Sequence, residues 1–584
     1  MESKSIWWWK LLAGHRRSLL LGLGSTLLCS FAAAWVPFWS GRAVHALEIK
    51  RYGDSHHALV WMLLFTLVAG IGRYLMRNTL IGLSREIEKV QREEIYAFLL
   101  TRSFAFYEKQ RIGDLMSRIG DDVSTVRMAT GPGFMSLLQT FSILPMTMAL
   151  MLHTHIRLTF AVMLPFSFLA LGFYFLSRKS HALQQKLQIV SSQLNTFSHE
   201  TIQGEKVVQA FGLEGLRVGR FRELSEDQAR LNIRQSSIFG TYGPMAALIG
   251  GVAALVLVAY GGTLVTRHEL SLGDLTAFTG YLVALAWPVM SLGWSVNLFQ
   301  RARAGQERIE EVLTSPEPAV PPLPQDEASA MPSVPAEIAL TDASFRFESG
   351  RGLGPISLKV ASGGSLAVVG GIGSGKSILL QTLAGLREVQ EGGYEVDGQP
   401  LGEATLRRHW AGLGWVPQEA FLFSTSLREN LIQGRPGASE AEIWEVAEVV
   451  CLDDLIRRLP AGLDTVVGER GVVLSGGERQ RTALARALLK KPRLLLMDDA
   501  LSAVDAETES RILENLKSYL GRTTLVLATH RIFVAELCED VLVMEQGRAI
   551  QFGTAAQLAE QQGLYARLKR LQSLEREILG AVKK

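Results

Sequence analysis

The stretch from 370 to 377 reads Gly370-Gly371-Ile372-Gly373-Ser374-Gly375-Lys376-Ser377, and it decides the fold of the second half of the chain. It follows the apolar run 366–369 and precedes a helical pattern that starts near Ile378. Glycines between a strand and a helix let backbone N–H groups surround phosphate oxygens, and the helix N-terminus adds positive potential. Lys376 is then expected to neutralise the β- and γ-phosphates, and the Ser377 hydroxyl to bind Mg²⁺. The stretch therefore predicts a nucleotide site in an α/β domain.

Two further apolar runs end in polar residues. The run 494–497 ends in Asp498 and Asp499, and the run 524–528 is followed by His530. The carboxyl ends of parallel strands collect the polar groups of α/β sites. Asp498 is expected to hold the magnesium ion, directly or through water, and Asp499 to orient the attacking water. His530 is expected to contact the γ-phosphate; a purely structural histidine is the alternative.

The first half of the chain is too apolar for a soluble domain. The 584-residue chain is 48% hydrophobic and has a positive mean hydropathy, which indicates a membrane protein. Six stretches reach or approach the roughly 20 residues that cross a bilayer as a helix. They are 18–38, 58–76, 131–152, 158–176, 238–260 and 275–298. An all-α transmembrane domain of six helices, followed by the α/β domain, is the expected fold.

Basic residues set the predicted orientation. The two long loops, after the second and the fourth span, are rich in Lys and Arg. Such residues near span ends are retained in the cytoplasm. We therefore expect a multi-pass protein of the cell (inner) membrane with both termini and the nucleotide domain in the cytoplasm. The loops are expected to continue the spans as helices, because their apolar residues recur at helical spacing. Trp7-Trp8-Trp9-Lys10 is typical of an interfacial anchor; a signal peptide is the alternative, without an obvious cleavage site.

Bulk charge and cysteine content argue against other classes. The formal net charge of +3 gives no reason to expect a nucleic-acid partner. Cys29, Cys451 and Cys538 are odd in number and far apart, which makes a disulfide framework or a zinc site improbable. Seven prolines between Ser315 and Pro335 predict an extended linker. The predicted domains are a transmembrane domain at 1–312, a linker at 313–335, a nucleotide-binding domain at 336–571 and a C-terminal tail at 572–584.

A second motif identifies a family resemblance. Leu474-Ser475-Gly476-Gly477-Glu478-Arg479-Gln480-Arg481 opens a helix that is expected to run to about Leu489. With this motif in place, nearly the whole chain resembles an ATP-binding cassette (ABC) exporter half-transporter. The resemblance implies a helical subdomain in the cassette and a second exporter subunit as partner. It also implies that the signature residues Ser475, Gly476, Gly477 and Glu478 face ATP held by that subunit, with the serine and the glycines against its γ-phosphate.

The resemblance assigns the remaining site residues. ATP and Mg²⁺ are the implied cofactors. The implied ATP-binding residues are Phe347, Gly370, Gly371, Gly373, Ser374, Gly375, Lys376, Ser377 and Gln418; the implied metal ligands are Ser377, Gln418 and Asp498; and the implied catalytic residues are Asp499 and His530. Phe347 matches an adenine-stacking aromatic that is usually tyrosine. The stretches 465–471 and 502–505 resemble the segment that contacts the membrane domain and the dimer-crossing loop. The stretches 113–118 and 200–214 resemble the two cytoplasmic loops that dock on the cassettes.

Asp499 departs from the family pattern, which has glutamate at this position. The shorter side chain withdraws the carboxylate by one methylene, about 1.5 Å. A misplacement near 1 Å can cost on the order of 100-fold in rate, so slow hydrolysis at this chain's own site is predicted. An otherwise intact signature motif, with Glu478 where glutamine is common, can still complete a partner's site. This combination favours the degenerate-site subunit of a heterodimer; a homodimer that tolerates aspartate is the alternative.

The resemblance implies ATP-driven export by alternating access. The spans suit a hydrophobic, amphiphilic or peptide substrate in contact with membrane lipid, without choosing among drugs, lipids and peptides. Arg73 and Arg77 in the second span are candidates for the substrate path, with snorkelling at the helix end as the alternative. An ATP-gated channel or a regulatory subunit on the same scaffold is a second class of function.

Overall fold

The computed structural model describes residues 14–316, 334–347, 350–468, 471–521 and 523–582. The chain divides into two compact units, which are described separately below. The first contains Met1–Ala97 and Gly113–Ser315, and the second contains Phe98–Ile112 and Pro316–Lys584. The Trp7–Lys10 anchor and most of the predicted linker lie outside the described residues.

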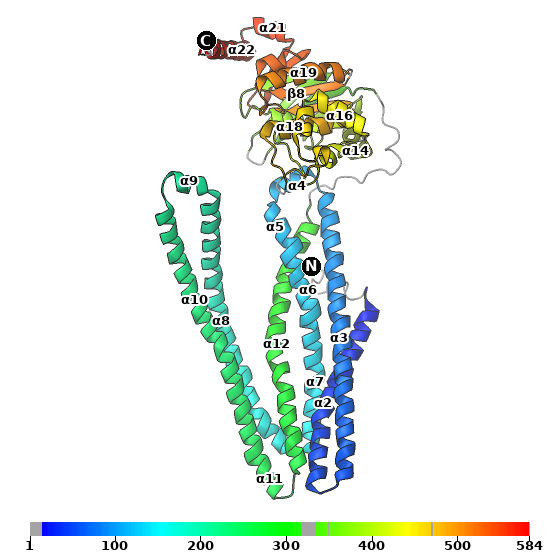
Figure 1. Ribbon diagram of the computed structural model, residues 1–584, viewed down its shortest axis with the longest axis vertical. Helices are drawn as coiled ribbons and strands as arrows, with labels where there is room; N and C mark the ends of the chain where they lie inside the picture. The colour runs from blue at the N-terminus through cyan, green and yellow to red at the C-terminus, as the bar shows by residue number, and fades with distance from the viewer. Residues whose placement is uncertain (1–13, 317–333, 348–349, 469–470, 522, 583–584) are drawn as a thin grey trace. The chain divides into compact units, whose positions relative to one another are not determined.

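The first unit is entirely helical. Its helices are α2 (Arg16–Glu48), α3 (Tyr52–Leu100), α5 (Ile112–Ser117), α6 (Val123–Met128), α7 (Phe134–Thr154), α8 (Ile156–Gln203), α9 (Glu205–Ala210), α10 (Glu214–Val256), α11 (Gly262–Thr266) and α12 (Leu272–Leu313). Helices α8 and α10 run side by side and are joined at one tip by the short α9 (Figure 1). The long basic loops therefore do continue the spans as helices, as their apolar periodicity predicted.

Each predicted span lies within a helical segment. Among the described residues, four segments are long and apolar enough to cross a membrane, namely Arg16–Glu48, Tyr52–Leu100, Ile112–Thr154 and Glu214–Thr266. The spans predicted at 158–176 and 275–298 lie in α8 and α12, both of which contain side chains outside the described residues in these ranges. The unit is thus a multi-pass helical domain, and the count of six spans stays a prediction.

Close backbone approach holds α2 against α12. A Cβ atom at Gly41 would lie 2.5 Å from the carbonyl oxygen of Gly273, and one at Gly273 would lie 2.2 Å from that of Gly41. Small residues at such crossings let membrane helices pack tightly where lipid offers no hydrophobic driving force. Buried hydroxyls add polar contacts, because Thr140 on α7 lies 3.2 Å from Ser291 on α12.

Ion pairs connect the ends of these helices beyond the apolar region. The buried Glu88 carboxylate on α3 contacts Arg85 and Arg92 of the same helix and Arg127 of α6. Arg308 on α12 donates from Nε to Asp122 at 2.9 Å. Each carboxylate is buried and paired. Separating these helices would leave a buried carboxylate without its counter-charge, which is costly.

The second unit contains two sheets. The larger has the order β10-β9-β3-β8-β7-β6 and is parallel except for β10, and the smaller is antiparallel with the order β2-β1-β4-β5. The strands are β1 (Ile338–Arg346), β2 (Gly352–Val360), β3 (Ser365–Gly370), β4 (Glu391–Val396), β5 (Gln399–Pro400), β6 (Leu413–Val416), β7 (Leu494–Asp498), β8 (Thr524–Thr529), β9 (Asp540–Glu545) and β10 (Arg548–Gly553). The expected α/β nucleotide-binding domain is confirmed.

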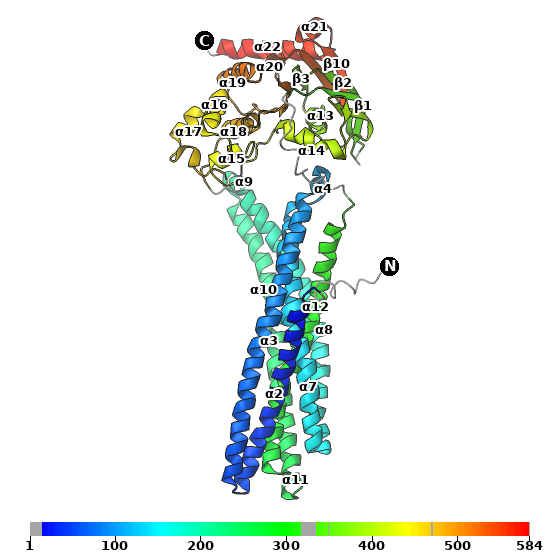
Figure 2. The ribbon, with the colours of Figure 1, turned by 90° about the vertical axis from the view of Figure 1, so that its right-hand side faces the viewer.

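A helical subdomain is inserted between β6 and β7. It contains α15 (Leu427–Ile432), α16 (Glu440–Val449), α17 (Asp453–Arg458) and α18 (Gly476–Leu489). Figure 2 shows α16, α17 and α18 grouped on the side of the unit away from β1, β2 and β10. Helix α18 begins within the motif 474–481 and ends at Leu489, as the sequence predicted.

Parallel pairing brings the functional motifs to one edge. The strand β7 is buried along its whole length, as expected for a central parallel strand, and Asp498 at its end pairs in register with Ala528 of β8. Val369 near the end of β3 pairs with Thr529 of β8. The three strands therefore end together, next to the turn that leads into α13 (Lys376–Leu383).

Two segments differ from the sequence reading. The short α4 (Phe104–Lys109), which sequence reasoning did not single out, belongs to the second unit and precedes the stretch 113–118. The C-terminal helix α22 (Leu564–Val582) continues across the predicted boundary at 571/572. Gln572 on this helix donates to the carbonyl oxygen of His530 at 2.7 Å, so the first residue of the predicted tail contacts the site region.

Candidate nucleotide site

The phosphate loop joins β3 to α13 through two left-handed glycines. Gly373 has φ +75° and Gly375 has φ +101°, a region that side chains with a Cβ avoid. A Cβ at Gly370 would lie 2.4 Å from the Met544 carbonyl oxygen, so a residue with a side chain would clash at this position. The backbone turn that the sequence predicted is therefore required by conformation and by packing.

Lys376 folds back over this loop. Its Nζ donates to the carbonyl oxygens of Gly370 at 2.9 Å and Gly371 at 3.0 Å. Burial lowers the pKa of Lys376 from its ordinary value, and the neighbouring Asp499 and Asp498 oppose that shift. A partly buried ammonium at the start of a helix forms a strong phosphate site, because its charge is poorly screened by water.

Asp498 and Ser377 lie together at the edge of the sheet. Burial raises the pKa of Asp498, whereas a hydrogen bond with Ser377 opposes the rise and the charge of Asp499 adds to it. Two neighbouring carboxylates beside a hydroxyl provide the hard oxygen ligands that Mg²⁺ prefers. The side chains present therefore fit the predicted metal site.

Asp499 contacts His530, as expected if both act on one phosphate. The His530 Nδ1 lies 3.2 Å from Asp499 Oδ1. The Asp499 backbone N–H donates to Ala528 at 2.9 Å, and the residue has φ +46°. Aspartate adopts this left-handed conformation more readily than longer side chains. The structure thus brings together Lys376, Ser377, Asp498, Asp499 and His530.

The signature motif forms the N-terminus of α18. The Ser475 hydroxyl accepts from Glu478 N–H at 3.3 Å, and Glu478 Oε2 accepts from Ser475 N–H at 2.7 Å. This reciprocal capping box satisfies donors that a helix start otherwise leaves free. Gly476 and Gly477 pack against Ala503, where a Cβ at Gly477 would lie 2.8 Å from the Ala503 carbonyl oxygen. Glycine is therefore required here by the neighbouring loop.

Gln480 is a functional candidate that sequence reasoning missed. Its buried amide donates to the Gln418 carbonyl at 3.3 Å and to the Ser502 hydroxyl at 3.1 Å, and it accepts from Ala503 N–H at 2.9 Å. Arg531 donates to the Ser502 carbonyl at 3.1 Å from the other side. One side chain thus joins the signature helix, the Gln418 loop and the loop 502–505. Its place five residues after Ser475 was visible in the sequence, but its partners were not.

Phe347 and Gln418 lie at the ends of other strands. Phe347 follows β1, half-buried, with its ring perpendicular to Phe345 at a centroid distance of 4.9 Å. Gln418 follows β6 with its side chain exposed. The described contacts of Ser475 and Glu478 do not reach the phosphate loop. In the segment 465–471, residues 469 and 470 lie outside the described residues.

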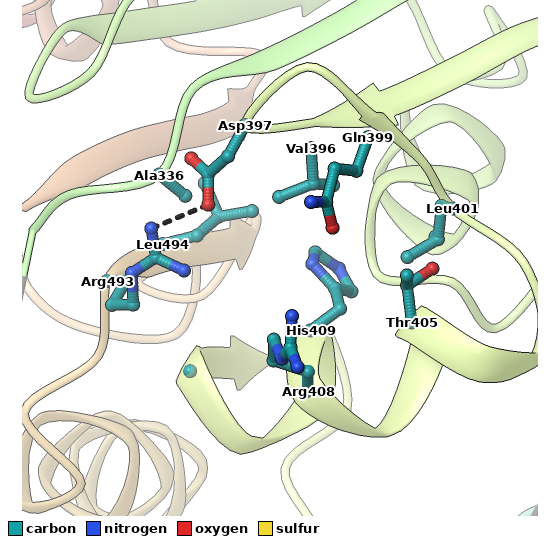
Figure 3. A pocket seen from close by; sticks show the side chains of 11 residues that line it. Ala336, Val396, Asp397, Gln399, Leu401, Thr405, Arg408, His409, Arg493 and Leu494 are labelled. Atoms are coloured by element: carbon teal, nitrogen blue, oxygen red, sulfur yellow. Dashed lines mark hydrogen bonds and ion pairs between the residues drawn. The ribbon is translucent and has the colours of Figure 1, made fainter. Parts of the chain in front are cut away.

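A small cavity in this unit is separate from the nucleotide site. Its volume is about 210 Å³, and its lining includes Asp397, His409 and Arg493 (Figure 3). Arg493 pairs with Asp397 at 2.7 Å. Leu494, which also lines the cavity, begins β7, whereas Asp498 ends it. The cavity therefore lies at the edge of the sheet opposite the phosphate loop.

Fold and site together define a P-loop nucleotide-binding domain fused to a helical membrane domain. The family model described as "ABC transporter transmembrane region" matches residues 19–289, and the model described as "ABC transporter" matches residues 353–502. The chain belongs to the ABC transporter family, and it is an exporter whose ATPase domain drives transport.

Relatives and a solved structure agree with this assignment. The chain is 34% identical to the probable multidrug resistance ABC transporter ATP-binding/permease protein YheI of Bacillus subtilis, over 84% of each chain. It is 30% identical to the ATP-dependent lipid A-core flippase of Syntrophus aciditrophicus, over 88% of this chain and 86% of the relative. The fold matches a bacterial Atm1-family ABC exporter with ATP bound at a TM-score of 0.79 and 26% identity, over 95% of this chain and 99% of the other.

Proposed function

We propose that this chain exports a hydrophobic or amphiphilic substrate by alternating access, as one subunit of a dimer that holds ATP between its two cassettes. The observation that carries the proposal is that one cassette contains both halves of such a site without joining them. Lys376 and Ser377 form the phosphate-binding half, and Ser475 at the start of α18 forms the other. A second subunit completes each site.

The tip of the α8–α10 pair supports a dimer. Ile202, Val207 and Phe211, around α9, are exposed apolar side chains at the tip that joins α8 to α10. Exposed apolar clusters rimmed by polar residues mark interaction sites. In the proposed dimer this tip docks on a cassette, which places it and the nucleotide domain in the cytoplasm.

Magnesium would be held by Ser377 and Asp498, with Gln418 as a further ligand. When bound, the ion supplies neutralisation of phosphate charge. The chain's own groups do the rest. Lys376 binds the phosphates, Asp499 orients water, and His530 contacts the γ-phosphate.

We assign the weaker of the two ATP sites to this chain's phosphate loop. Asp499 is held by His530 and by the β8 backbone, so its carboxylate cannot advance to replace the missing methylene without breaking these contacts. Slow hydrolysis at this site and normal hydrolysis at a partner's site describe a heterodimer. A homodimer that tolerates aspartate remains the alternative arrangement.

The substrate class follows from the relatives and the spans. YheI and MdlA of Escherichia coli are named for multidrug resistance, and the Syntrophus protein is named a lipid A-core flippase. Arg73 and Arg77 both lie on exposed positions of α3, which fits a substrate path and equally fits snorkelling at the helix end. We propose an amphiphilic drug or lipid as substrate and the cell membrane as location.

Transport into sealed vesicles tests the proposal. Inside-out vesicles that contain the assembled complex should accumulate a lipophilic dye against its gradient when Mg²⁺ and ATP are supplied, and the Lys376→Ala variant should not. Flux that ATP opens but that only follows the gradient would indicate a channel. Loss of both accumulation and flux, with ATPase intact, would indicate a regulatory subunit.

Purification from the native host tests the heterodimer. A tagged chain should bring down a second exporter subunit that has glutamate at the position of Asp499. An active dimer of this polypeptide alone would refute the heterodimer and leave the exporter assignment in place.

A further inference from the structure

Arg387 is a buried cation that no step of ATP hydrolysis uses. Its side chain is 6% exposed, and its Nη1 and Nη2 donate to the two carboxylate oxygens of Glu108 at 2.9 and 2.5 Å. Its Nε donates to Gln381 on α13 at 2.7 Å. Glu108 lies on α4, which is far from Arg387 in sequence but in the same compact unit. The guanidinium is thus fixed in position by three hydrogen bonds.

Three aromatic rings surround this guanidinium. Its carbon lies 5.4 Å from the centroid of Phe104 on α4, 5.0 Å from that of Phe345 and 4.9 Å from that of Phe347. These distances fall within the range of cation–π attraction. Phe347 is the residue expected to stack on adenine. A tyrosine could anchor its hydroxyl by a hydrogen bond, whereas phenylalanine is positioned by its ring contacts alone.

We propose that Arg387 is a positioning residue for the base of the nucleotide and that Glu108 sets its position, so that affinity for the adenine part of ATP depends on α4. The proposal rests on the ATP-binding function proposed above. In the proposed site, Arg387 lies against the Phe347 ring and the base stacks on the other face of that ring. The resulting order is cation, ring and base.

The bidentate pair makes this arrangement sensitive to α4. Arginine and carboxylate match in a fixed geometry, so displacement of α4 moves the guanidinium or leaves it buried without a counter-charge. Binding linkage is reciprocal: if Glu108 strengthens base binding, the bound base holds α4 by the same factor. α4 follows α3 closely along the chain, so base occupancy is communicated to the segment that leads out of the membrane domain.

Comparing two ligands separates a base effect from general damage. ATP contacts both Phe347 and the phosphate loop, whereas inorganic triphosphate contacts the phosphate loop alone. The full-length protein in nanodiscs, with Mg²⁺, is titrated with each ligand. Glu108→Gln keeps the shape and removes the charge, and Arg387→Lys keeps the charge and removes the fork. Glu388→Gln, an exposed carboxylate beside Arg387, is the matched control.

We expect Glu108→Gln and Arg387→Lys each to raise the Kd for ATP at least about 5-fold and to change the Kd for triphosphate less than about 2-fold. Glu388→Gln should change neither. The two substitutions should be non-additive when combined, because they disrupt one interaction. Equal weakening of ATP and triphosphate, or an unchanged Kd for ATP, overturns the proposal. If the unsubstituted protein binds neither ligand, the proposed ATP function fails instead.

Discussion

The substitution Asp499→Glu tests the proposed weakness of this chain's own ATP site. It restores the family residue and extends the carboxylate by one methylene, about 1.5 Å. A catalytic group that is misplaced by about 1 Å can lower the rate by on the order of 100-fold. We therefore expect hydrolysis at this site to rise between about 10-fold and 100-fold.

The backbone conformation at position 499 makes the Asp499→Glu substitution slightly unfavourable for stability. Asp499 has φ +46°, which aspartate tolerates better than glutamate. Loss of part of that advantage should lower the free energy of unfolding by less than about 1 kcal/mol. The longer side chain must also rearrange against His530, which now lies 3.2 Å from the carboxylate. Activity should therefore rise while stability falls slightly, a combination that a general repair of folding would not give.

The assay must separate the two sites of the dimer. Labelled nucleotide trapped with vanadate reports hydrolysis on each chain, and steady-state ATPase reports the sum. Asp499→Asn should abolish trapping on this chain, and Asp540→Glu, which makes the same change at the start of β9, should have no effect. Unchanged trapping in both Asp499 variants would show that this position does not limit hydrolysis, and would refute the reasoning.

Three further substitutions have defined outcomes. Gln480→Glu removes the donors to Gln418 and Ser502 and should lower kcat at least about 10-fold with little change in the Kd for ATP; a proportional loss of both would indicate simple destabilisation. Glu478→Gln preserves the capping box with Ser475 but removes a carboxylate from the helix start, so the KM for ATP at the partner's site should fall about 2-fold to 5-fold in steady-state assays. Burial lowers the pKa of His409 to about 4. The hydrogen bond to the Leu383 carbonyl and the charge of Asp397 oppose this shift, and the charges of Arg493 and Lys490 add to it. The unfolded chain, with an ordinary value near 6.5, therefore binds more protons, and the free energy of unfolding should fall by about 2 to 3 kcal/mol between pH 7 and pH 4.5. In the His409→Gln variant this part of the fall in unfolding free energy should disappear. The measurement is urea unfolding at each pH, monitored by hydrogen exchange of the cassette.

The sequence was sufficient wherever a local pattern has a single physical solution. The glycine pattern around Lys376 favours left-handed backbone, and the short apolar run before Asp498 favours a buried strand, so both were predicted within a residue or two. The helix that contains the motif 474–481 was also predicted, whereas the capping box between Ser475 and Glu478 at its start was found only in the structure.

Contacts between distant segments could not be predicted in this way. Nothing near Glu108 indicates that it pairs with Arg387, since both are ordinary charged residues in helical or turn patterns. Gln480 appears in the sequence as one polar residue of an amphipathic helix, and only the fold places its amide between two loops.

In the proposed dimer, the two departures from the family pattern, Asp499 and Glu478, act on different sites. Asp499 lies beside Lys376 and would affect ATP bound to this chain, whereas Glu478 lies at the start of α18 and would affect ATP bound to the partner. In a homodimer each of the two sites would contain both departures, a short catalytic carboxylate and an extra negative charge next to the phosphate. In a heterodimer with an ordinary partner, each site contains only one of them. The partner's own site then keeps its glutamate and meets only the charge of Glu478, which the capping box directs toward the backbone of Ser475. A pairing that divides the two departures between two sites preserves one efficient site, and this favours a distinct partner over a second copy of the chain.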